Sequence, residues 1–461
     1  CVAAIHAVLS DARAGKALID GEPVQPGDIA VLVRSHREAT MIQQALALVG
    51  IAAVAAGKQS LFATAEARDP REALAQDLAG EHVMRNLALK AQRKLRESYG
   101  AHATIHVFKN NVDSAGHAFG CHENYLVRRF VPLETIEHQL LPFLITRQLY
   151  TGAGRMTPDG FQITQRADFL DEAVSSATTR SRPMVNTRDE PHADPDSFRR
   201  LHVIIGDSNR SQWSTWMKLA VTHLVLCAIE DAFRHGTPSG FEHCAFADPA
   251  AANRTVSRFL DDLHAELTLE SGESVSALGL QRRYYAAVKA FIETHVDALA
   301  SSLPATTIDT IMGEWSRVLD ALERGAYDAL ADRVDWAAKK RLFDALKRRR
   351  PDVTFAQMEQ LELYYHDIAN GRLYGSLVAR NQMRELLTGD NVEYAVHNPP
   401  TDTRADLRGR FVDAALNVGA QFSADWTHLT LTAPERREAI LLYPFEAEPT
   451  LGFEQLMEAL N

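Results

Sequence analysis

The chain has 461 residues, 46% hydrophobic and 24% charged, as expected for a globular protein with a substantial buried core. Its net charge of −11 argues against nucleic-acid binding over the whole surface. The four cysteines, Cys1, Cys121, Cys227 and Cys244, have no CxxC spacing and are too few for a disulfide scaffold, which predicts reduced thiols in a cytoplasmic protein.

The first 66 residues have a pattern of their own and predict a short β-α-β fragment. Apolar spacing predicts one helix over residues 2–14 and another over 38–49, where Gly50 stands in the position of a C-cap glycine. Continuous apolar runs predict buried strands over residues 29–34 and 51–56.

From residue 69 onward the composition changes, and strands are expected before helices, which indicates an α+β fold. A charged amphipathic helix is predicted first, over residues 74–97. Short strands are then predicted over residues 104–108, 121–127, 162–166 and 202–205. Three-to-four-residue apolar spacing predicts helices over 276–299, 307–323, 328–348 and 355–368, followed by strands over 426–432 and 439–442. The most apolar helix, 216–233, carries enough polar side chains to be a core helix and not a membrane span.

A glycine-rich turn followed by a polar strand is the first candidate site. Residues 109–120 lead into a strand in which His122, Glu123 and Asn124 follow one another. Because side chains alternate along a strand, His122 and Asn124 are expected on one face and Glu123 on the other. These residue types suit a metal or hydrogen-bonding site at the end of a sheet, and the alternative is a polar turn with one hydrogen-bonded histidine.

Two further clusters have residues suited to a nucleotide. In residues 175–194, Arg182 and Arg188 offer forks of N–H donors that match phosphate oxygens, and His192 and the neighbouring carboxylates could hold a divalent cation. This combination suits ATP–Mg²⁺ chemistry, and the alternative is a solvated loop whose charges pair with each other. Trp426 begins a predicted strand, where it could stack on an adenine or simply pack in the core.

These clusters belong to six blocks of sequence that together resemble the Pup ligase family, proteasome accessory factor A. The blocks occur in the family's order, and the matching region runs from Ala63 to the C-terminus. They are FKNNVDSAGHAFGCHENYL (108–126), SSATTRSRPMVNTRDEPHAD (175–194), RRLHVIIGDSN (199–209), ALGLQRRYY (277–285), PPTDTRADLRG (399–409) and DWTHL (425–429). The forms DSAG, GCHENY and SSATTRSRP are similar to the ligase and not to its relative, the Pup deamidase.

The resemblance implies a glutamine-synthetase-like curved sheet packed with helices, with a small C-terminal domain. The expected domains are residues 1–66, 67–395 and 396–461. The implied reaction uses ATP to phosphorylate the side-chain carboxylate of the C-terminal Glu of Pup, and a lysine of a target protein then attacks the acyl phosphate. The implied cofactors are ATP and Mg²⁺, and the implied partners are Pup, lysine-bearing target proteins and the proteasome pathway, without a membrane.

The resemblance also implies roles for individual residues. Thr64 and Trp426 are similar by position to family ATP contacts, and Arg182 and Arg188 are expected at the phosphates. The expected metal ligands are His122, His192 and Glu123.

Before Ala63 the chain departs from the family pattern. The family's strands GIETEFG and RLYLDVGSHPEYATAE are represented only by ATAE, residues 63–66. Counting back in register, Ala55 takes the place of the catalytic Asp and Leu61 that of a metal-binding Glu, so no catalytic base is assigned. Residues 28–69 instead resemble part of a UvrD/RecB-type helicase motor. The alternatives to ligation are therefore an inactive fusion that only binds Pup or ATP, a Pup deamidase or depupylase, and a helicase-related fragment.

Overall fold

The computed structural model describes residues 2–19, 21–29, 31, 41–42, 45–46, 49, 51, 65–176, 182–190, 192–262, 264–295, 299, 303–433 and 435–460. The chain divides into two compact units, Cys1–Ala63 and Thr64–Asn461. The expected domain boundaries at residues 66 and 395 stay a prediction.

The first unit begins with helix α1, Val2–Arg13, which confirms the helix predicted there. Strands β1, Leu18–Ile19, and β2, Glu22–Pro23, form a small antiparallel hairpin, and a 3₁₀ turn follows at Pro26–Asp28. The second predicted helix is described only at residues 41–42 and 45–46, which are helical, and at residue 49, which lies in a turn. Most of the predicted strands at 29–34 and 51–56 lies outside the described residues, and residues 29, 31 and 51, which are described, are in no strand.

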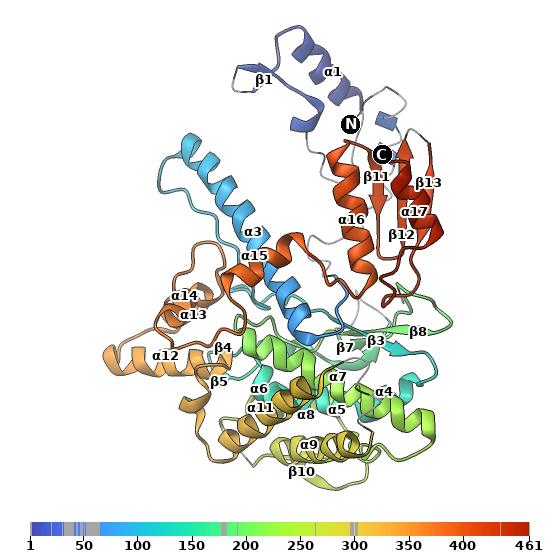
Figure 1. Ribbon diagram of the computed structural model, residues 1–461. Helices are drawn as coiled ribbons and strands as arrows, with labels where there is room; N and C mark the ends of the chain where they lie inside the picture. Colours follow the sequence, from blue (N-terminus) through green and yellow to red (C-terminus); the bar gives the residue numbers. More distant parts are fainter. Residues whose placement is uncertain are drawn as a thin grey trace. The chain divides into compact units, whose positions relative to one another are not determined.

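The second unit contains a four-stranded sheet in the order β3-β8-β7-β6. Strands β3, β7 and β8 are labelled in Figure 1. Strands β3 and β8 pair antiparallel, with Asn124 opposite His202, and β8 also pairs antiparallel with β7. Strand β6 pairs parallel with β7. The strands are β3, Glu123–Arg128; β6, Glu172–Ser175; β7, Pro183–Asn186; and β8, Phe198–Val203.

The inner face of this sheet packs against helix α7, Gln212–His235, in one continuous core. Val127 and Leu201 of the sheet belong to the same buried cluster as Trp213 of α7. Ser211 accepts a hydrogen bond from the backbone N–H of Ser214 and so caps the start of α7. The helix is buried along most of its length, which confirms the predicted core helix.

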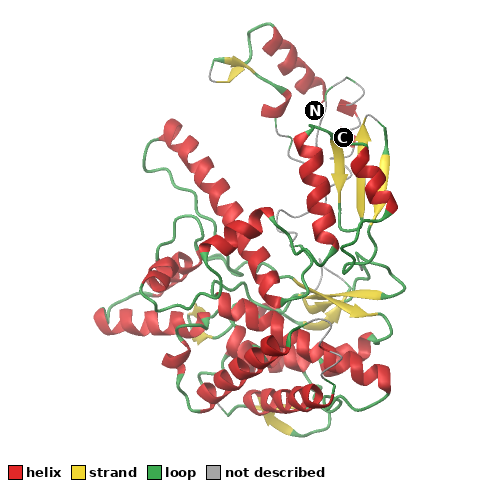
Figure 2. Cartoon of the chain, in the orientation of Figure 1, coloured by secondary structure: helices red, strands yellow, loops and turns green. Residues whose placement is uncertain are grey.

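Helices make up most of the rest of the second unit (Figure 2). Its long first helix, α3, spans Pro70–Tyr99 and confirms the amphipathic helix predicted at 74–97. Among the described residues, the helices before residue 400 also include α4, Leu133–Gln139; α5, Leu141–Thr146; α6, Gln148–Thr151; α8, Pro249–Ser257; α9, Ala277–Thr294; α11, Ala305–Glu323; α12, Asp335–Arg349; α13, Phe355–His366; α14, Leu373–Ala379; and α15, Gly389–His397. Two small antiparallel hairpins pair β4, Arg155–Thr157, with β5, Gly160–Gln162, and β9, Glu266–Thr268, with β10, Ser274–Ser276.

The C-terminal part has a separate buried cluster of apolar side chains. A three-stranded antiparallel sheet in the order β11-β12-β13 packs with helices α16 and α17. The cluster includes Leu407, Phe411, Leu429 and Leu456. The elements are α16, Arg404–Asn417; β11, Gln421–Ala424; β12, His428–Ala433; β13, Arg437–Ile440; and α17, Leu451–Glu458.

Several predicted elements differ from the structure. The strand predicted at 202–205 is β8, which begins at Phe198 and ends at Val203. Residues 104–108 form no strand and make only a single bridge, from Phe108 to Asp367, because side chains take up the backbone groups that a ladder would use. For example, the Ile105 N–H donates to the Gln92 side chain, and the Val107 N–H donates to the Asp367 carboxylate. The predicted strand at 162–166 ends at Gln162. The predicted helix at 328–348 is a 3₁₀ turn, Tyr327–Leu330, followed by α12, which begins at Asp335.

Within the described parts of the chain, every helix is too short or too polar to cross a membrane. The three described cysteines, Cys121, Cys227 and Cys244, are free thiols.

Candidate functional site

Strand β3 carries His122 and Asn124 toward one face of the sheet and Glu123 toward the other. Glu123 is buried, whereas His122, immediately before the strand, and Asn124 are exposed. The alternation expected from the sequence is therefore confirmed. The two faces of this strand have different chemistry.

On the outer face, two histidines form a pair. Nδ1 of His122 lies 2.7 Å from Nε2 of His202, which comes from the neighbouring strand β8. Burial and the nearby His122 and Arg200 lower the pKa of His202 to about 4. Burial, Arg166 and Arg200 also lower the pKa of His122. Both rings are therefore neutral at pH 7, and an N–H of one ring donates a hydrogen bond to the unprotonated nitrogen of the other.

Arg200 stands at the centre of this outer face. Its guanidinium donates to the Asn124 side chain and to the carbonyl oxygen and carboxylate of Glu190. Its charge lowers the pKa of His122, His202 and His192. For each of these histidines, burial lowers the pKa more than Arg200 does. The three histidines therefore share one electrostatic environment dominated by arginine.

Arg166 adds a buried positive charge to the same environment. It donates to the carbonyl oxygen of Ile204, but its Nε has no hydrogen-bond partner. Burial lowers the pKa of this guanidinium. An arginine left partly unpaired beside two neutral histidines favours an anionic ligand, because the ligand would supply the missing acceptor.

The two arginines expected at the phosphates lie at either end of strand β7. The guanidinium of Arg182 lies 6.0 Å from the centre of the Phe169 ring. Arg188 follows β7, donates its backbone N–H to the Asn186 side chain, and lies 3.7 Å from Glu190 in an exposed ion pair. Arg188 also lowers the pKa of His202 and so belongs to the outer face.

The inner face of β3 is closed by an ion pair. Both carboxylate oxygens of Glu123 accept from Nη2 of Arg147, at 2.6 and 2.8 Å, and Tyr125 donates to Glu123 at 2.6 Å. Burial alone would raise the pKa of Glu123, but Arg147 and Lys218 outweigh it and lower the pKa. The carboxylate is therefore ionised and fully occupied by protein partners.

Trp426 forms a second part of the site, between β11 and β12. Its ring stacks with His192 at a centroid distance of 5.9 Å, and the guanidinium of Arg408 lies 5.1 Å from its centre. His192 has a positive φ of 49°, which is uncommon for a residue other than glycine and marks a constrained backbone. This arrangement brings together His192 and Trp426, which the sequence placed in separate clusters.

We call the stacked rings of Trp426 and His192 the Trp426 platform. Glu66 holds this platform in place through two arginines. Its carboxylate lies 2.7 Å from both Arg404 and Arg408. Arg404 also donates to the carbonyl oxygen of His192. The glutamate of the motif ATAE therefore links α16, through Arg404, to the loop carrying His192. Thr64, in the same motif, lies outside the described residues, as do Ala55 and Leu61.

The three expected metal ligands each have another partner here. His122 is bonded to His202, His192 is stacked on Trp426, and Glu123 is bonded to Arg147. The described residues contain no group of three or more His, Cys, Asp or Glu side chains placed to hold a metal ion. The three residues therefore do not form a metal site among themselves, and their assignment as ligands stays a prediction.

Several residues of this site had no assigned role in the sequence reasoning. His202 and Arg200 lie in the block 199–209, Arg404 and Arg408 in the block 399–409, and Glu66 in ATAE. Because these residues lie in the blocks that resemble the family, the sequence could have marked them as candidates for the site. Only strand pairing and helix packing show which of their side chains meet.

Comparison with known proteins places the chain in a family. A model of the Pup-ligase protein family matches residues 36–430. The chain belongs to this family. It is 98% identical over 405 residues to a Pup–protein ligase of Bifidobacterium longum strain DJO10A, covering 88% of this chain and 83% of that protein. It is 61% identical over 406 residues to the Pup–protein ligase of Bifidobacterium dentium, with the same coverage.

Two solved structures are similar in fold. The Pup ligase PafA in complex with ADP matches with a TM-score of 0.79 and 33% identity, covering 94% of this chain and 96% of that chain. PafA in complex with Pup matches with a TM-score of 0.77 and 35% identity, covering 86% and 79%. These matches confirm the expected α+β, glutamine-synthetase-like fold. The helicase resemblance of residues 28–69 finds no support among them.

Proposed function

We propose that this chain is an enzyme that ligates the C-terminal glutamate of Pup to lysines of target proteins and consumes ATP. The observation that carries the proposal is the 98% identity, over 88% of the chain, to a Pup–protein ligase. The relatives named above are ligases, so the deamidase and helicase alternatives are not favoured.

The site supports this proposal by its charge. Transfer of a phosphoryl group from ATP to a carboxylate brings several negative charges together, and positive groups must offset their repulsion. Arg188 and Arg200 on the outer face of the sheet offer such groups, together with Arg166, which lowers the pKa of His122, and Arg182, whose charge acts on Arg166. The complex of the 33% identical PafA with ADP supports nucleotide binding by this chain. We assign the nucleotide phosphates to this face because of its positive charge.

The base of the nucleotide is assigned to the Trp426 platform. Its aromatic ring is half-buried and lies beside Arg408, and a flat ring of this kind suits stacking with adenine. Thr64, Arg182 and Arg188 complete the proposed set of ATP contacts. Since Ala55 stands where the family's catalytic Asp is expected, no residue is assigned here as the base that deprotonates the lysine.

Mg²⁺ is part of the proposal as an ion that accompanies the nucleotide. Mg²⁺ keeps several water ligands and is commonly bound through substrate phosphates with one or two carboxylates. Since His122, His192 and Glu123 do not converge, we derive no catalytic step from the ion. A cytoplasmic location is likewise proposed, on the free thiols of the described cysteines.

The test is a ligation assay with purified chain, Pup, ATP, Mg²⁺ and a lysine-bearing protein. We expect a covalent conjugate that requires ATP and that releases one ADP for each bond formed. Pup ending in Gln is the matched control, because an amide cannot be phosphorylated in place of the carboxylate. Conversion of that Gln to Glu would instead indicate deamidation, and binding of Pup and ATP without any conjugate would indicate an inactive binding protein.

A further inference from the structure

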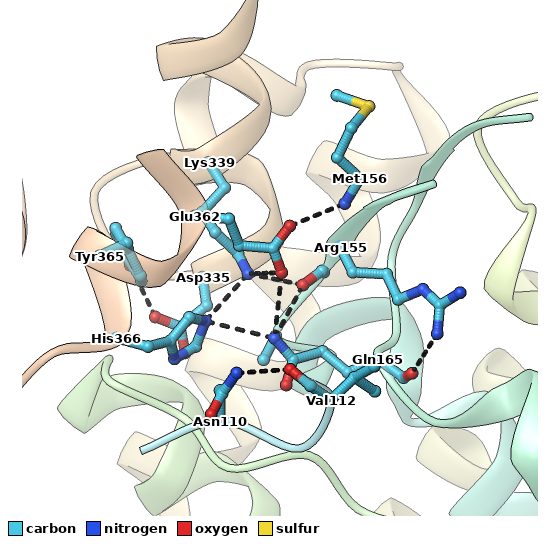
Figure 3. A network of polar contacts seen from close by, with 12 residues as sticks. Asn110, Val112, Arg155, Met156, Gln165, Asp335, Lys339, Glu362, Tyr365 and His366 are labelled. Atoms are coloured by element: carbon cyan, nitrogen blue, oxygen red, sulfur yellow. Dashed lines mark hydrogen bonds and ion pairs between the residues drawn. The ribbon is translucent and has the colours of Figure 1, made fainter. Parts of the chain in front are cut away.

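A buried ammonium group, that of Lys339, is linked through His366 to residues 109–120, the glycine-rich loop that leads to His122. Lys339, on helix α12, is 1% exposed, and its Nζ contacts the carbonyl oxygen of Gly154 at 2.5 Å, Glu362 at 3.2 Å and Nε2 of His366 at 2.9 Å (Figure 3). An ammonium has three donors and no acceptor, so all three of its hydrogens are used. The proposed ligase chemistry uses neither Lys339 nor His366.

The contact with Lys339 fixes the protonation state of His366. Because the lysine only donates, Nε2 of His366 must accept, and the proton of the neutral ring lies on Nδ1. Nδ1 lies 2.7 Å from the carbonyl oxygen of Lys109 and donates to it. The backbone N–H of Lys109 in turn donates to the carbonyl oxygen of His366, at 3.0 Å. His366 therefore holds the backbone of Lys109 by two hydrogen bonds.

The segment anchored at Lys109 extends to His122. The buried Asn111 exchanges hydrogen bonds with Phe119, because the Phe119 N–H donates to the Asn111 carbonyl at 2.8 Å and the Asn111 side chain donates to the Phe119 carbonyl at 3.2 Å. This closes the loop of residues 111–119. At Gly120, an added Cβ would clash with Nε2 of His122, so the histidine ring packs directly against this glycine.

A second route joins the same network to the outer face of the sheet. The Gln165 amide nitrogen lies 3.3 Å from Nε2 of His366, and its carbonyl oxygen accepts from the Asn111 N–H at 2.8 Å. The next residue is Arg166, whose charge lowers the pKa of His122. Both neighbours of His122 in the site are therefore next to a contact of His366: its own loop starts at Lys109, whose backbone bonds to His366, and Arg166 follows Gln165, whose side chain lies beside His366.

We propose that His366 is a positioning residue for ligation, which holds residues 109–120 and thereby the place of His122 on the sheet. The inference rests on the proposed function for its effect on rate, but its structural part can be tested on inactive protein. His366 touches neither nucleotide nor Pup in this proposal. It acts through the backbone of Lys109.

The first experiment compares His366→Leu with Tyr365→Phe. Tyr365 is the preceding residue on α13, is equally buried and donates to Asp335 at 2.6 Å, so its replacement removes one buried hydrogen bond that does not reach the loop. We expect His366→Leu to lower kcat for conjugation by about tenfold or more, since small misplacements in a site cost rate, with the KM for ATP changed less than about threefold. Equal kcat for the two variants would overturn the proposal.

The second experiment measures the anchor without activity. Hydrogen exchange at Asn111 and Phe119 should be faster in His366→Leu than in wild type or Tyr365→Phe, and ¹⁵N NMR should show the proton of His366 on Nδ1. A proton on Nε2, or unchanged exchange, would refute the anchoring whatever the activity. If wild type forms no conjugate, the proposed function fails, while these measurements still decide the anchor.

A conservative variant distinguishes anchoring from general packing. His366→Asn keeps an amide donor near the position of Nδ1 and loses the acceptor for Lys339, which retains Gly154 and Glu362. We expect its kcat to recover to within about threefold of wild type if the bond to Lys109 is what matters. A loss as large as that of His366→Leu would show that the role is packing and would contradict the proposal.

Discussion

The two faces of strand β3 differ in whether their charges are paired. On the inner face, Glu123 meets Arg147, and both groups are almost completely buried, at 3% and 0% side-chain exposure. On the outer face, His122 and His202 are neutral and lie among arginines, one of which has an unpartnered Nε. The same strand therefore carries a closed ion pair on one side and an excess of positive charge on the other.

The difference separates stability from binding. A buried ion pair contributes little relative to an apolar pair, but removal of one partner is costly because the other charge is left unpaired. Replacement of an exposed arginine lowers the folding stability of the protein only slightly, because water solvates the partner that is left. We therefore expect substitutions on the inner face to affect unfolding and those on the outer face to affect nucleotide affinity.

The largest expected effect is from Arg147→Met on the inner face. It leaves the Glu123 carboxylate buried without its main partner, and we expect the free energy of unfolding to fall by about 3–5 kcal/mol. Denaturant unfolding at pH 7 measures this. The double variant Glu123→Gln with Arg147→Met removes both charges and should recover at least half of the loss. A single-variant loss under about 1 kcal/mol would contradict the closed ion pair.

Next in size is Trp426→Ala on the platform. Loss of stacking should weaken ADP binding by about 1–3 kcal/mol, as for other base–aromatic stacks. Isothermal titration calorimetry with ADP measures the effect, and Trp426→Phe, which retains a ring, is the matched control. If Trp426→Ala binds ADP like wild type, the adenine lies elsewhere.

A smaller effect is expected from Arg188→Gln on the outer face, because the Arg188 side chain is 50% exposed. Affinity for ADP should fall about tenfold, which corresponds to about 1.4 kcal/mol, while the free energy of unfolding changes by less than about 1 kcal/mol. Arg129→Gln is the control, since Arg129 also pairs with a loop carboxylate, that of Asp189, at 2.7 Å. Equal loss of affinity in both variants would mean that only net charge matters.

The smallest expected effect is the pH dependence of stability due to His202. Burial, His122 and Arg200 lower its pKa to about 4, so the folded protein binds fewer protons than the unfolded chain between about pH 4 and the ordinary histidine value near 6.5. Stability should therefore fall as the pH decreases through this window and stay level above it. The contribution is on the order of 1 kcal/mol for this partly exposed ring.

Unfolding midpoints at several pH values, compared between wild type and His202→Asn, test this prediction. The variant should show a flatter dependence between pH 6.5 and 4. An identical slope in both proteins would assign the pH dependence to other groups.

Periodicity located the long elements well and the short ones poorly. Helices α3, α9, α11 and α13 begin and end within a few residues of their predicted bounds, because their apolar spacing extends over several turns. Residues 104–108 alternate like a strand, yet Gln92 and Asp367 take up their backbone N–H groups. No local pattern reveals a partner 260 residues away.

For the site, sequence identified residues but not their partners. The pattern around His122 predicted the two faces of β3 correctly, because alternation is a property of the strand itself. It could not show that Glu123 would meet Arg147 and be occupied. Nor could it show that His192 and Trp426, more than two hundred residues apart, would stack.

By itself, the sequence determined the family, the α+β class and the long helices, because matched blocks and apolar periodicity are recorded along the chain. Only the tertiary structure decided which charges are neutralised and which are left available. Burial and the distance to an opposite charge set that outcome, and both are fixed when β3, β8 and α7 pack together.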